Sequence, residues 1–352
     1  LFPFDTQLHQ LACGGGTSAP VPISSKVKAR RLAAVGSGGK DGSESSGSAR
    51  AAGRSVEKKL LERAALRTNS SGLLLIAVGA NAAAECSLAA ATARAHGSKG
   101  PDGERLRVVL MADDVAAARV REHGTVADLF DEVRGLPEEA AAAVKAHGAW
   151  AAKISSFAHT PFDFTLFIDC DVSVAMHDAP RDLLALTQQP DTDIALSETA
   201  FQSGGAPGAA ASAPFAHGRA GVCTCVLAWA SLSVTRQLWR DARRRFDTPG
   251  DFHPGISRRG DQEALWAELE RRSRTGAAAT LAVRVLPLEW QCPAMLPVAG
   301  RGRPRIEFGG GSRIPSRACR FTHSAGGAAE HQLSAVLPAY ETALRRMPHV
   351  KE

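Results

Sequence analysis

An apolar run that ends abruptly at two carboxylates is the feature that most constrains this chain. Residues 164–168, Phe-Thr-Leu-Phe-Ile, have the composition of a buried central strand in a mostly parallel sheet. Asp169 follows the run directly, and Asp171 comes two residues later. Ligands of α/β sheets bind outside the carboxyl ends of the strands. The sequence therefore predicts a functional site at the end of this strand.

Asp169 and Asp171 also predict a bound cation. Two carboxylates this close repel each other, and neither is readily buried without a partner. A divalent cation held between the acids and a phosphate removes that conflict, and Mg²⁺ and Mn²⁺ prefer carboxylate and phosphate oxygens. The alternative is an acidic corner between strand and loop that only faces water.

Charge and composition narrow the class of partner. The 352 residues include 42 Lys and Arg against 36 Asp and Glu, which gives a net charge of +6. Aromatic residues make up 5% of the chain and do not interleave with its basic clusters, so we expect no nucleic-acid partner. No stretch reaches about 18 uninterrupted apolar residues, so we expect no membrane span. The chain does not begin with Met, which leaves an upstream signal or anchor open.

The seven cysteines show neither a Cys-x-x-Cys pair nor zinc-site spacing. Cys223 and Cys225 are two residues apart, as on one face of a strand. No disulfide framework is expected from this pattern, and the redox compartment stays open.

Residues 1–70 are rich in Gly, Ser and basic residues and bury little apolar surface, so we predict a disordered leader or stem. Within it, residues 55–66 have the pattern of one short helix. The folded domain is expected over residues 71–346.

Strands and helices are expected to alternate through this domain, which indicates crossover units and a parallel sheet. The expected strands are 72–78, 106–111, 164–168, 192–196, 220–228, 281–286 and 319–322, with a further short strand or turn over 125–134. The expected helices are 83–96, 115–122, 137–158, 180–188, 234–246, one that begins at 261, and 333–344.

Several short motifs follow one another in a fixed order along this pattern. They are Trp150 with Lys153-Ile154, Pro161-Phe162, Leu166 to Asp171, Ala220-Gly221-Val222, Asp261-Gln262, Leu286-Pro287 and His323. This order resembles the GT-A glycosyltransferases, in the nucleotide-diphospho-sugar transferase and glycogenin-like branch, over about residues 73–324. The resemblance implies a single α/β domain of the GT-A (Rossmann-like) type, a mostly parallel sheet flanked by helices.

The resemblance also implies roles for individual residues. Asp169 and Asp171 would hold Mn²⁺ or Mg²⁺ on the diphosphate of a nucleotide-sugar donor, with His323 as the third protein ligand. The turn after the first strand would face the nucleotide. The candidate contacts to the nucleotide-sugar are Val78, Gly79 and Gly221.

Lys153 and Asp261 complete the implied site. Lys153 would add positive charge near the diphosphate or donor sugar, and its alternative is an ordinary lysine on a helix surface. Asp261 would hydrogen-bond the transferring sugar or the acceptor hydroxyl as the catalytic residue, and its alternative is a helix cap. Two positions depart from the family pattern, since Arg219 and Gln291 stand where Asn is common.

The expected function is metal-dependent transfer of a sugar from a nucleotide-diphosphate donor, UDP-linked by expectation, to a hydroxyl of a glycan or glycoprotein. A stem-like N-terminus and the resemblance favour the Golgi or the secretory pathway, with the cytoplasm as the alternative. Two rivals stay open: a phosphatase of the haloacid-dehalogenase type, in which Asp169 is the nucleophile, and a GT-A-like domain that binds nucleotide-sugar or glycan without turnover.

Overall fold

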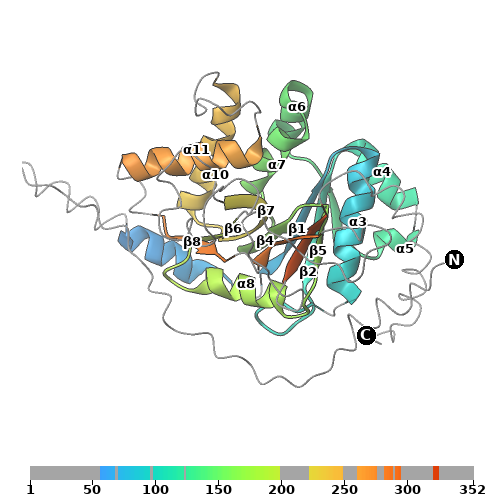
Figure 1. Ribbon diagram of the computed structural model, residues 1–352, viewed down its shortest axis with the longest axis horizontal. Helices are drawn as coiled ribbons and strands as arrows, with labels where there is room; N and C mark the ends of the chain where they lie inside the picture. Colours follow the sequence, from blue (N-terminus) through green and yellow to red (C-terminus); the bar gives the residue numbers. More distant parts are fainter. Residues whose placement is uncertain are drawn as a thin grey trace, which may run out of the picture.

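Strand β4 (Phe164–Ile168) lies at the centre of the molecule, as its apolar composition requires (Figure 1). The described strands form a seven-stranded sheet in the order β3-β2-β1-β4-β7-β6-β8 and a small sheet in the order β5-β10-β9. The computed structural model describes residues 56–67, 70–95, 98–122, 124–198, 222–248, 260–275, 281–287, 290–294 and 320–324.

The chain alternates between strands and helices. The strands are β1 (Ser71–Ala77), β2 (Arg107–Ala112), β3 (Glu132–Gly135), β4, β5 (Val172–Val174), β6 (Ile194–Glu198), β7 (Val222–Ala230), β8 (Val283–Leu286), β9 (Cys292–Ala294) and β10 (Phe321–Ser324). The helices are α3 (Gly79–Ala95), α4 (Asp114–Glu122), α5 (Gly124–Ala127), α6 (Glu138–His147), α7 (Ala149–Phe157), α8 (Ala179–Gln188), α10 (Ser233–Asp247) and α11 (Asp261–Arg274).

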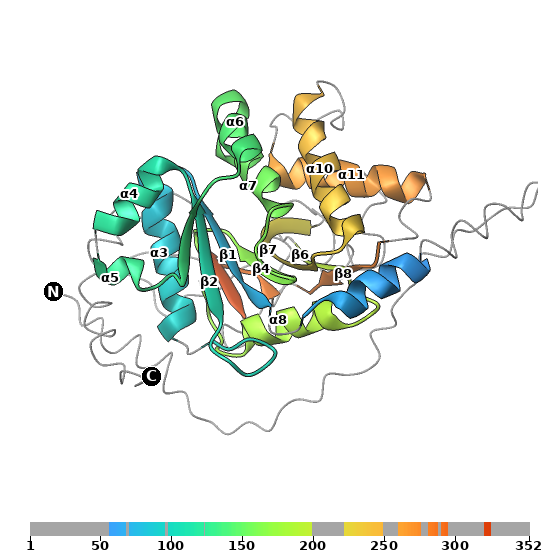
Figure 2. The ribbon, with the colours of Figure 1, turned by 180° about the vertical axis from the view of Figure 1, so that it is seen from behind.

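The large sheet is mostly parallel, and the expected α/β architecture is confirmed. Strand β1 pairs in parallel with β2 and β4, and β6 pairs in parallel with β8. Strand β7 is the exception, because it runs antiparallel to both of its neighbours, β4 and β6. Crossover helices cover both faces of the sheet (Figures 1 and 2).

Side chains of β1 show how the two faces are filled. Leu73 and Leu75 belong to an apolar cluster with α3, α4 and α8, whereas Leu74 and Ile76 belong to a second cluster with α7, α10 and α11. Alternate residues of a strand point to opposite faces. Because both faces are covered by helices, the strand is apolar at every position from Leu73 to Ala77 rather than at every second one.

The expected helix over residues 137–158 is wrong in one respect, because the structure has two helices there. Helix α6 ends at His147 and α7 begins at Ala149, with Gly148 between them at φ 82°. This left-handed conformation suits glycine, which has no Cβ to clash. The break allows α7 to take its own direction over the sheet (Figure 1).

The expected short helix near residue 60 is present over residues 56–65 and packs on the domain. Arg63 donates to the carbonyls of Thr187 and Thr192 and to Asp193 (2.7 Å), and Lys59 also reaches Asp193 (2.8 Å). Asp193 is fully buried, and it also accepts a hydrogen bond from the Ala282 amide. This helix is therefore part of the folded unit, upstream of the expected start at residue 71.

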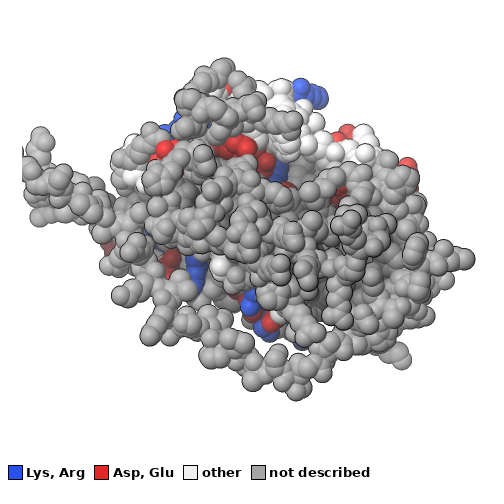
Figure 3. All heavy atoms as spheres, viewed as in Figure 1, with Lys and Arg blue, Asp and Glu red and all other residues white. Residues whose placement is uncertain are grey.

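Some expectations fall on parts of the chain outside the described residues. They are the leader over residues 1–55, the helix over 333–344, and the positions Gly221 and Arg219. Among the described helices, none combines the length and the apolar composition that crossing a bilayer requires. On the face shown in Figure 3, acidic and basic side chains of the described residues lie interspersed.

Candidate functional site at the end of strand β4

The two predicted metal-binding acids flank a tight turn at the carboxyl end of β4. The amide of Asp169 donates to the Cys225 carbonyl (2.8 Å), which continues the ladder between β4 and β7. The amide of Val172 then donates to the Asp169 carbonyl (2.9 Å) and closes a turn over residues 169–172. Asp169 and Asp171 are both partly buried at this edge of the sheet.

Lys153 of α7 lies against the first of these acids. Its Nζ is 2.7 Å from Oδ1 of Asp169 and 2.5 Å from Oδ2 of Asp261, and it stands 5.0 Å from the centre of the Phe167 ring. The residue is only 8% exposed. The alternative that Lys153 is an ordinary surface lysine is therefore wrong.

Asp261 is the first residue of α11, but its carboxylate does not cap that helix. The cap position is Gly260, and no side-chain cap bond is made there. The hydroxyl of Thr224, on β7, instead donates to Oδ2 of Asp261 and accepts a hydrogen bond from Lys153 (3.3 Å). We call Lys153, Asp169, Asp261 and Thr224 the Lys153 cluster.

Electrostatics inside the Lys153 cluster favour the charged lysine. Burial alone lowers the pKa of Lys153, but the charges of Asp169 and Asp261 outweigh it and hold that pKa above its usual value. Burial raises the pKa of Asp169 to about 6, and the negative charges of Asp261 and Asp171 add to the effect against the opposing charge of Lys153. The pKa of Asp169 therefore stays above its usual value despite the contact with Lys153.

Lys153 uses only one oxygen of each acid. It contacts Oδ1 of Asp169, and both Lys153 and Thr224 contact Oδ2 of Asp261. Among the described residues, Oδ2 of Asp169 and Oδ1 of Asp261 have no partner. Two carboxylate oxygens of the cluster thus remain free to accept from a ligand.

A further acid lies near this edge that the sequence did not single out. Burial, followed by the charge of Asp171, raises the pKa of Glu85 on α3. Glu85 therefore lies close enough to Asp171 for the two charges to interact.

His323 comes to the same place through its backbone. Strand β10 pairs antiparallel with β5, and this register places His323 opposite Val172, the residue after Asp171. The side chain of His323 lies outside the described part of the structure. In the described part, no three His, Cys, Asp or Glu side chains are grouped as a metal site. The role of His323 as third ligand stays a prediction.

The predicted nucleotide-facing turn lies between β1 and α3. Gly79 opens α3 at φ 83°, and its amide donates to both carboxylate oxygens of Asp113 (3.1 Å each). Asp113 also accepts from the Ala116 amide (2.8 Å) at the start of α4. Val78 is partly buried beside this turn. Asp113 thus ties the turn after β1 to the turn after β2, and the nucleotide contact of Val78 and Gly79 stays a prediction.

Thr224 and Gln291 lie near the candidate site, and the sequence did not predict the hydrogen bonds that their side chains make. Gln291 is buried, accepts from the hydroxyl of Ser197, and donates to the sulfur of Cys223 (3.3 Å). These contacts join residues far apart in the chain. A polar residue within an otherwise apolar strand, such as Thr224, was the available signal.

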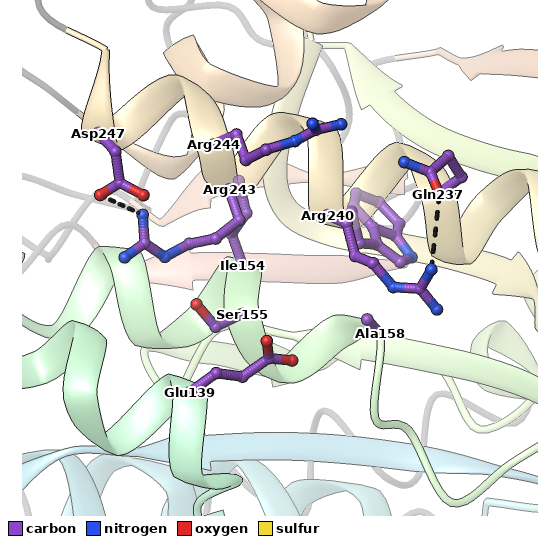
Figure 4. A pocket seen from close by; sticks show the side chains of 10 residues that line it. Glu139, Ile154, Ser155, Ala158, Gln237, Arg240, Arg243, Arg244 and Asp247 are labelled. Carbon is purple, nitrogen blue, oxygen red and sulfur yellow. Dashed lines mark hydrogen bonds and ion pairs between the residues drawn. The ribbon is translucent and has the colours of Figure 1, made fainter.

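A groove of about 520 Å³ lies between α7 and α10, with Glu139 of α6 at its edge (Figure 4). Its charges are largely paired: Arg243 contacts Asp247 (2.9 Å), Asp247 also contacts His147 (2.8 Å), and Glu139 contacts His159. None of the predicted site residues lines this groove.

Solved structures similar to this one include glycosyltransferases, whereas no protein-family model and no curated protein matches the sequence. The galactosyltransferase LgtC, solved with donor and acceptor sugar analogues, is 16% identical at a TM-score of 0.47, and the match covers 80% of this chain and 98% of that one. Mouse xyloside xylosyltransferase 1 is 11% identical at a TM-score of 0.41, with 72% and 97% covered.

The bifunctional glycosyltransferase WbbM is 12% identical at a TM-score of 0.46. The match covers 79% of this chain and 51% of WbbM, so this chain spans about half of that protein. These likenesses are too distant to assign a function, and the side chains of the Lys153 cluster carry the function proposed next.

Proposed function

We propose that this chain is a metal-dependent glycosyltransferase that moves a sugar from a nucleotide-diphosphate donor to a hydroxyl group of a glycan or glycoprotein. The observation that carries the proposal is the arrangement at the end of β4. There Asp169 and Asp261 converge from two elements on one buried lysine, which engages a single oxygen of each, and Asp171 follows Asp169 in the same turn.

The residues present fit a divalent cation. Asp169 keeps Oδ2 free among the described residues, Asp171 follows it in the same turn, and the backbone of His323 is adjacent to that turn. Carboxylate oxygens and imidazole suit Mn²⁺, and carboxylates also suit Mg²⁺. When bound, such a cation neutralises charge on the departing nucleoside diphosphate.

Lys153 and Thr224 position the second acid. Both contact Oδ2 of Asp261, which fixes the carboxylate and leaves Oδ1 as the oxygen directed to a ligand. We assign this oxygen to a hydrogen bond from a hydroxyl of the donor sugar or of the acceptor. Fixed acceptors of this kind reduce the reorganisation needed when the substrate reacts.

The donor is proposed to be UDP-linked. The turn at Gly79 and Asp113 supports a nucleotide pocket beside the acids, because both lie after parallel strands that end at the same edge as β4. For localisation we propose the Golgi or another secretory compartment. The disulfide between Cys86 and Cys170 supports an oxidising compartment.

The test is release of nucleoside diphosphate from a panel of nucleotide-sugars, with and without Mn²⁺, for the wild-type chain and for Asp171→Asn. We expect release from one donor that needs Mn²⁺ and falls at least about 100-fold in the variant, since second-shell losses alone reach that range. The matched control is Asp128→Asn, which changes an exposed acid and should leave the rate unchanged.

Other outcomes select the rivals. Mn²⁺-dependent binding of a donor without release, even with a panel of acceptors present, would favour a binding domain. Phosphate release from phosphomonoesters that disappears in Asp169→Asn, together with no binding of any nucleotide-sugar, would favour the phosphatase.

A further inference from the structure

Cys170, the residue between the two acids, is covalently tied to a helix. It is the second residue of the turn over 169–172, and its sulfur forms a disulfide with Cys86 of α3, 84 positions earlier in the chain. Cys86 is fully buried, whereas Cys170 is partly buried. The disulfide therefore joins the candidate cation site to the core of the domain.

The same helix holds the chain again just beyond the turn. The amide of Val174 donates to the hydroxyl of Thr92 on α3 (3.0 Å). Asp171 thus lies between two attachments to α3, one at Cys170 and one at Val174. Both attachments act on the site through the position of the turn.

A turn that presents two carboxylates to one cation has to keep their relative position. Free residues of a loop lose roughly 1–2 kcal/mol of conformational entropy each when they are ordered, and a turn already fixed does not lose it on binding. Cys170 can fix the turn only if its own side chain is bound to another part of the protein. The disulfide with Cys86 provides that bond.

We infer that Cys86 is a positioning residue of this site, which acts through its disulfide with Cys170 to fix Asp169 and Asp171 for a divalent cation. This inference rests on the proposed function. Reduction of the disulfide then lowers the affinity for the cation and leaves the fold in place, because neither cysteine belongs to a strand of the large sheet.

Formation of the Cys86–Cys170 disulfide needs an oxidant, and its reduction needs a reductant. Oxidation of the thiols of Cys86 and Cys170 releases two protons and two electrons, and a small-molecule or protein disulfide takes up both and becomes two thiols. In the reverse direction a phosphine reductant becomes the phosphine oxide, takes its oxygen from water, and leaves two thiols on the protein.

Peptide mapping of the full chain, purified without reductant, tests the bond itself. We expect the peptide that contains Cys86 to be linked to the peptide that contains Cys170. Free thiols at both positions would overturn the inference.

Titration with Mn²⁺, followed by the paramagnetic resonance signal of the free ion, tests the positioning role. We expect phosphine reduction of the wild-type chain to weaken Mn²⁺ binding about tenfold or more, the size of typical outer-shell effects. Cys86→Ala should show the same weakened affinity and no further response to reductant. A Cys223→Ala/Cys225→Ala chain, which lacks the second disulfide, should keep the full response.

Thermal unfolding of the reduced wild-type chain separates positioning from stability. A cooperative unfolding transition well above the temperature of the binding assay, together with weakened Mn²⁺ binding, supports the inference. Equal Mn²⁺ affinity before and after reduction would overturn it. A third outcome is a wild-type chain in which Cys86 and Cys170 are joined but Mn²⁺ does not bind. It would overturn the proposed cation site and the positioning role together, while the mapped disulfide would stand.

Discussion

At the scale of single residues, Lys153 is the side chain on which the site depends. It is buried, and its ammonium group compensates Asp169 and Asp261 at once, at 2.7 and 2.5 Å. Removing one partner of a buried ion pair leaves the other charge without compensation, which is far more costly than losing an exposed pair. The lysine was singled out from the sequence, but its burial was not.

Replacing Lys153 with methionine should therefore destabilise the chain by about 3–5 kcal/mol in the absence of added cation. Equilibrium denaturation in urea measures this loss. Lys58→Met is the matched control, since the Lys58 side chain is 74% exposed, and it should change the free energy of unfolding by less than about 0.5 kcal/mol. Equal effects of the two substitutions would show that Lys153 is not the buried partner of the acids.

Asp131 gives a pH-dependent prediction away from the site. Despite partial burial, which raises its pKa, hydrogen bonds from the Val108 amide and Arg94 and the charge of Arg105 hold that pKa below 3.8. The ionised carboxylate therefore stabilises the fold above pH 3.8, and this contribution is lost as the pH falls through the folded-state pKa.

Asp131→Asn should accordingly lower the free energy of unfolding by about 1.5–3 kcal/mol at pH 7, the range for hydrogen bonds to charged groups. The difference from the wild-type chain should shrink as the pH falls below 3.8. Denaturation curves at pH 7 and pH 3 measure both values. A difference that stays constant between them would exclude ionisation of Asp131 as its cause.

At the scale of elements, the helix over residues 56–65 is held by one buried acid. Asp193 accepts from Lys59, from Arg63 and from the Ala282 amide, so it links this helix to β6 and to the chain entering β8. Sequence patterns identify such a helix but not its docking site, because the contacts join residues about 130 positions apart.

Asp193→Asn should cost about 3–5 kcal/mol, because Lys59 and Arg63 then lose the buried charge they share. Thermal unfolding measures the loss. Asp191→Asn, at an exposed position two residues earlier, is the control and should be nearly neutral. If the two variants unfold alike, the helix is not held through Asp193.

The sequence predicted the bounds of some helices and strands better than those of others. Strand β4 was predicted with its observed bounds, since its apolar run is bordered by polar residues on both sides. The break between α6 and α7 was missed, because one glycine inside an apolar helical pattern is often tolerated. The small sheet was largely missed: β5 and β9 have three residues each, too few for a period to be visible.

At the scale of the whole molecule, the order of elements predicted the mostly parallel sheet, because strand–helix alternation leaves few other arrangements. The cluster of Lys153 with Thr224 could not be predicted in this way. The cluster depends on the position of α7 relative to β7 at the carboxyl end of β4. That position follows from the packing of helices on both faces of the large sheet.

Chains that begin at different residues test where the folded unit starts. A chain that begins at residue 56 keeps both cationic partners of Asp193, whereas one that begins at residue 71 lacks them. We expect the shorter chain to unfold about 6–12 °C lower, from a loss of about 3 kcal/mol at 2–4 °C per kcal/mol.

Asp193→Asn provides the internal check on this comparison. Its effect should be small in the chain from residue 71, since the partners are already absent, and large in the chain from residue 56. Equal effects in both chains would place the stabilising partner of Asp193 elsewhere.

The reversed direction of β7 has a consequence for how such a protein can diverge. Because β6 and β7 are antiparallel neighbours, the chain leaves the sheet after Glu198 and re-enters at Val222, which lies opposite Glu198 in the register. Lengthening or exchanging that connection changes neither strand pairing nor register, and the entropic penalty of a longer loop grows slowly. An insertion between β6 and β7 is therefore expected to leave the large sheet and the Lys153 cluster in place.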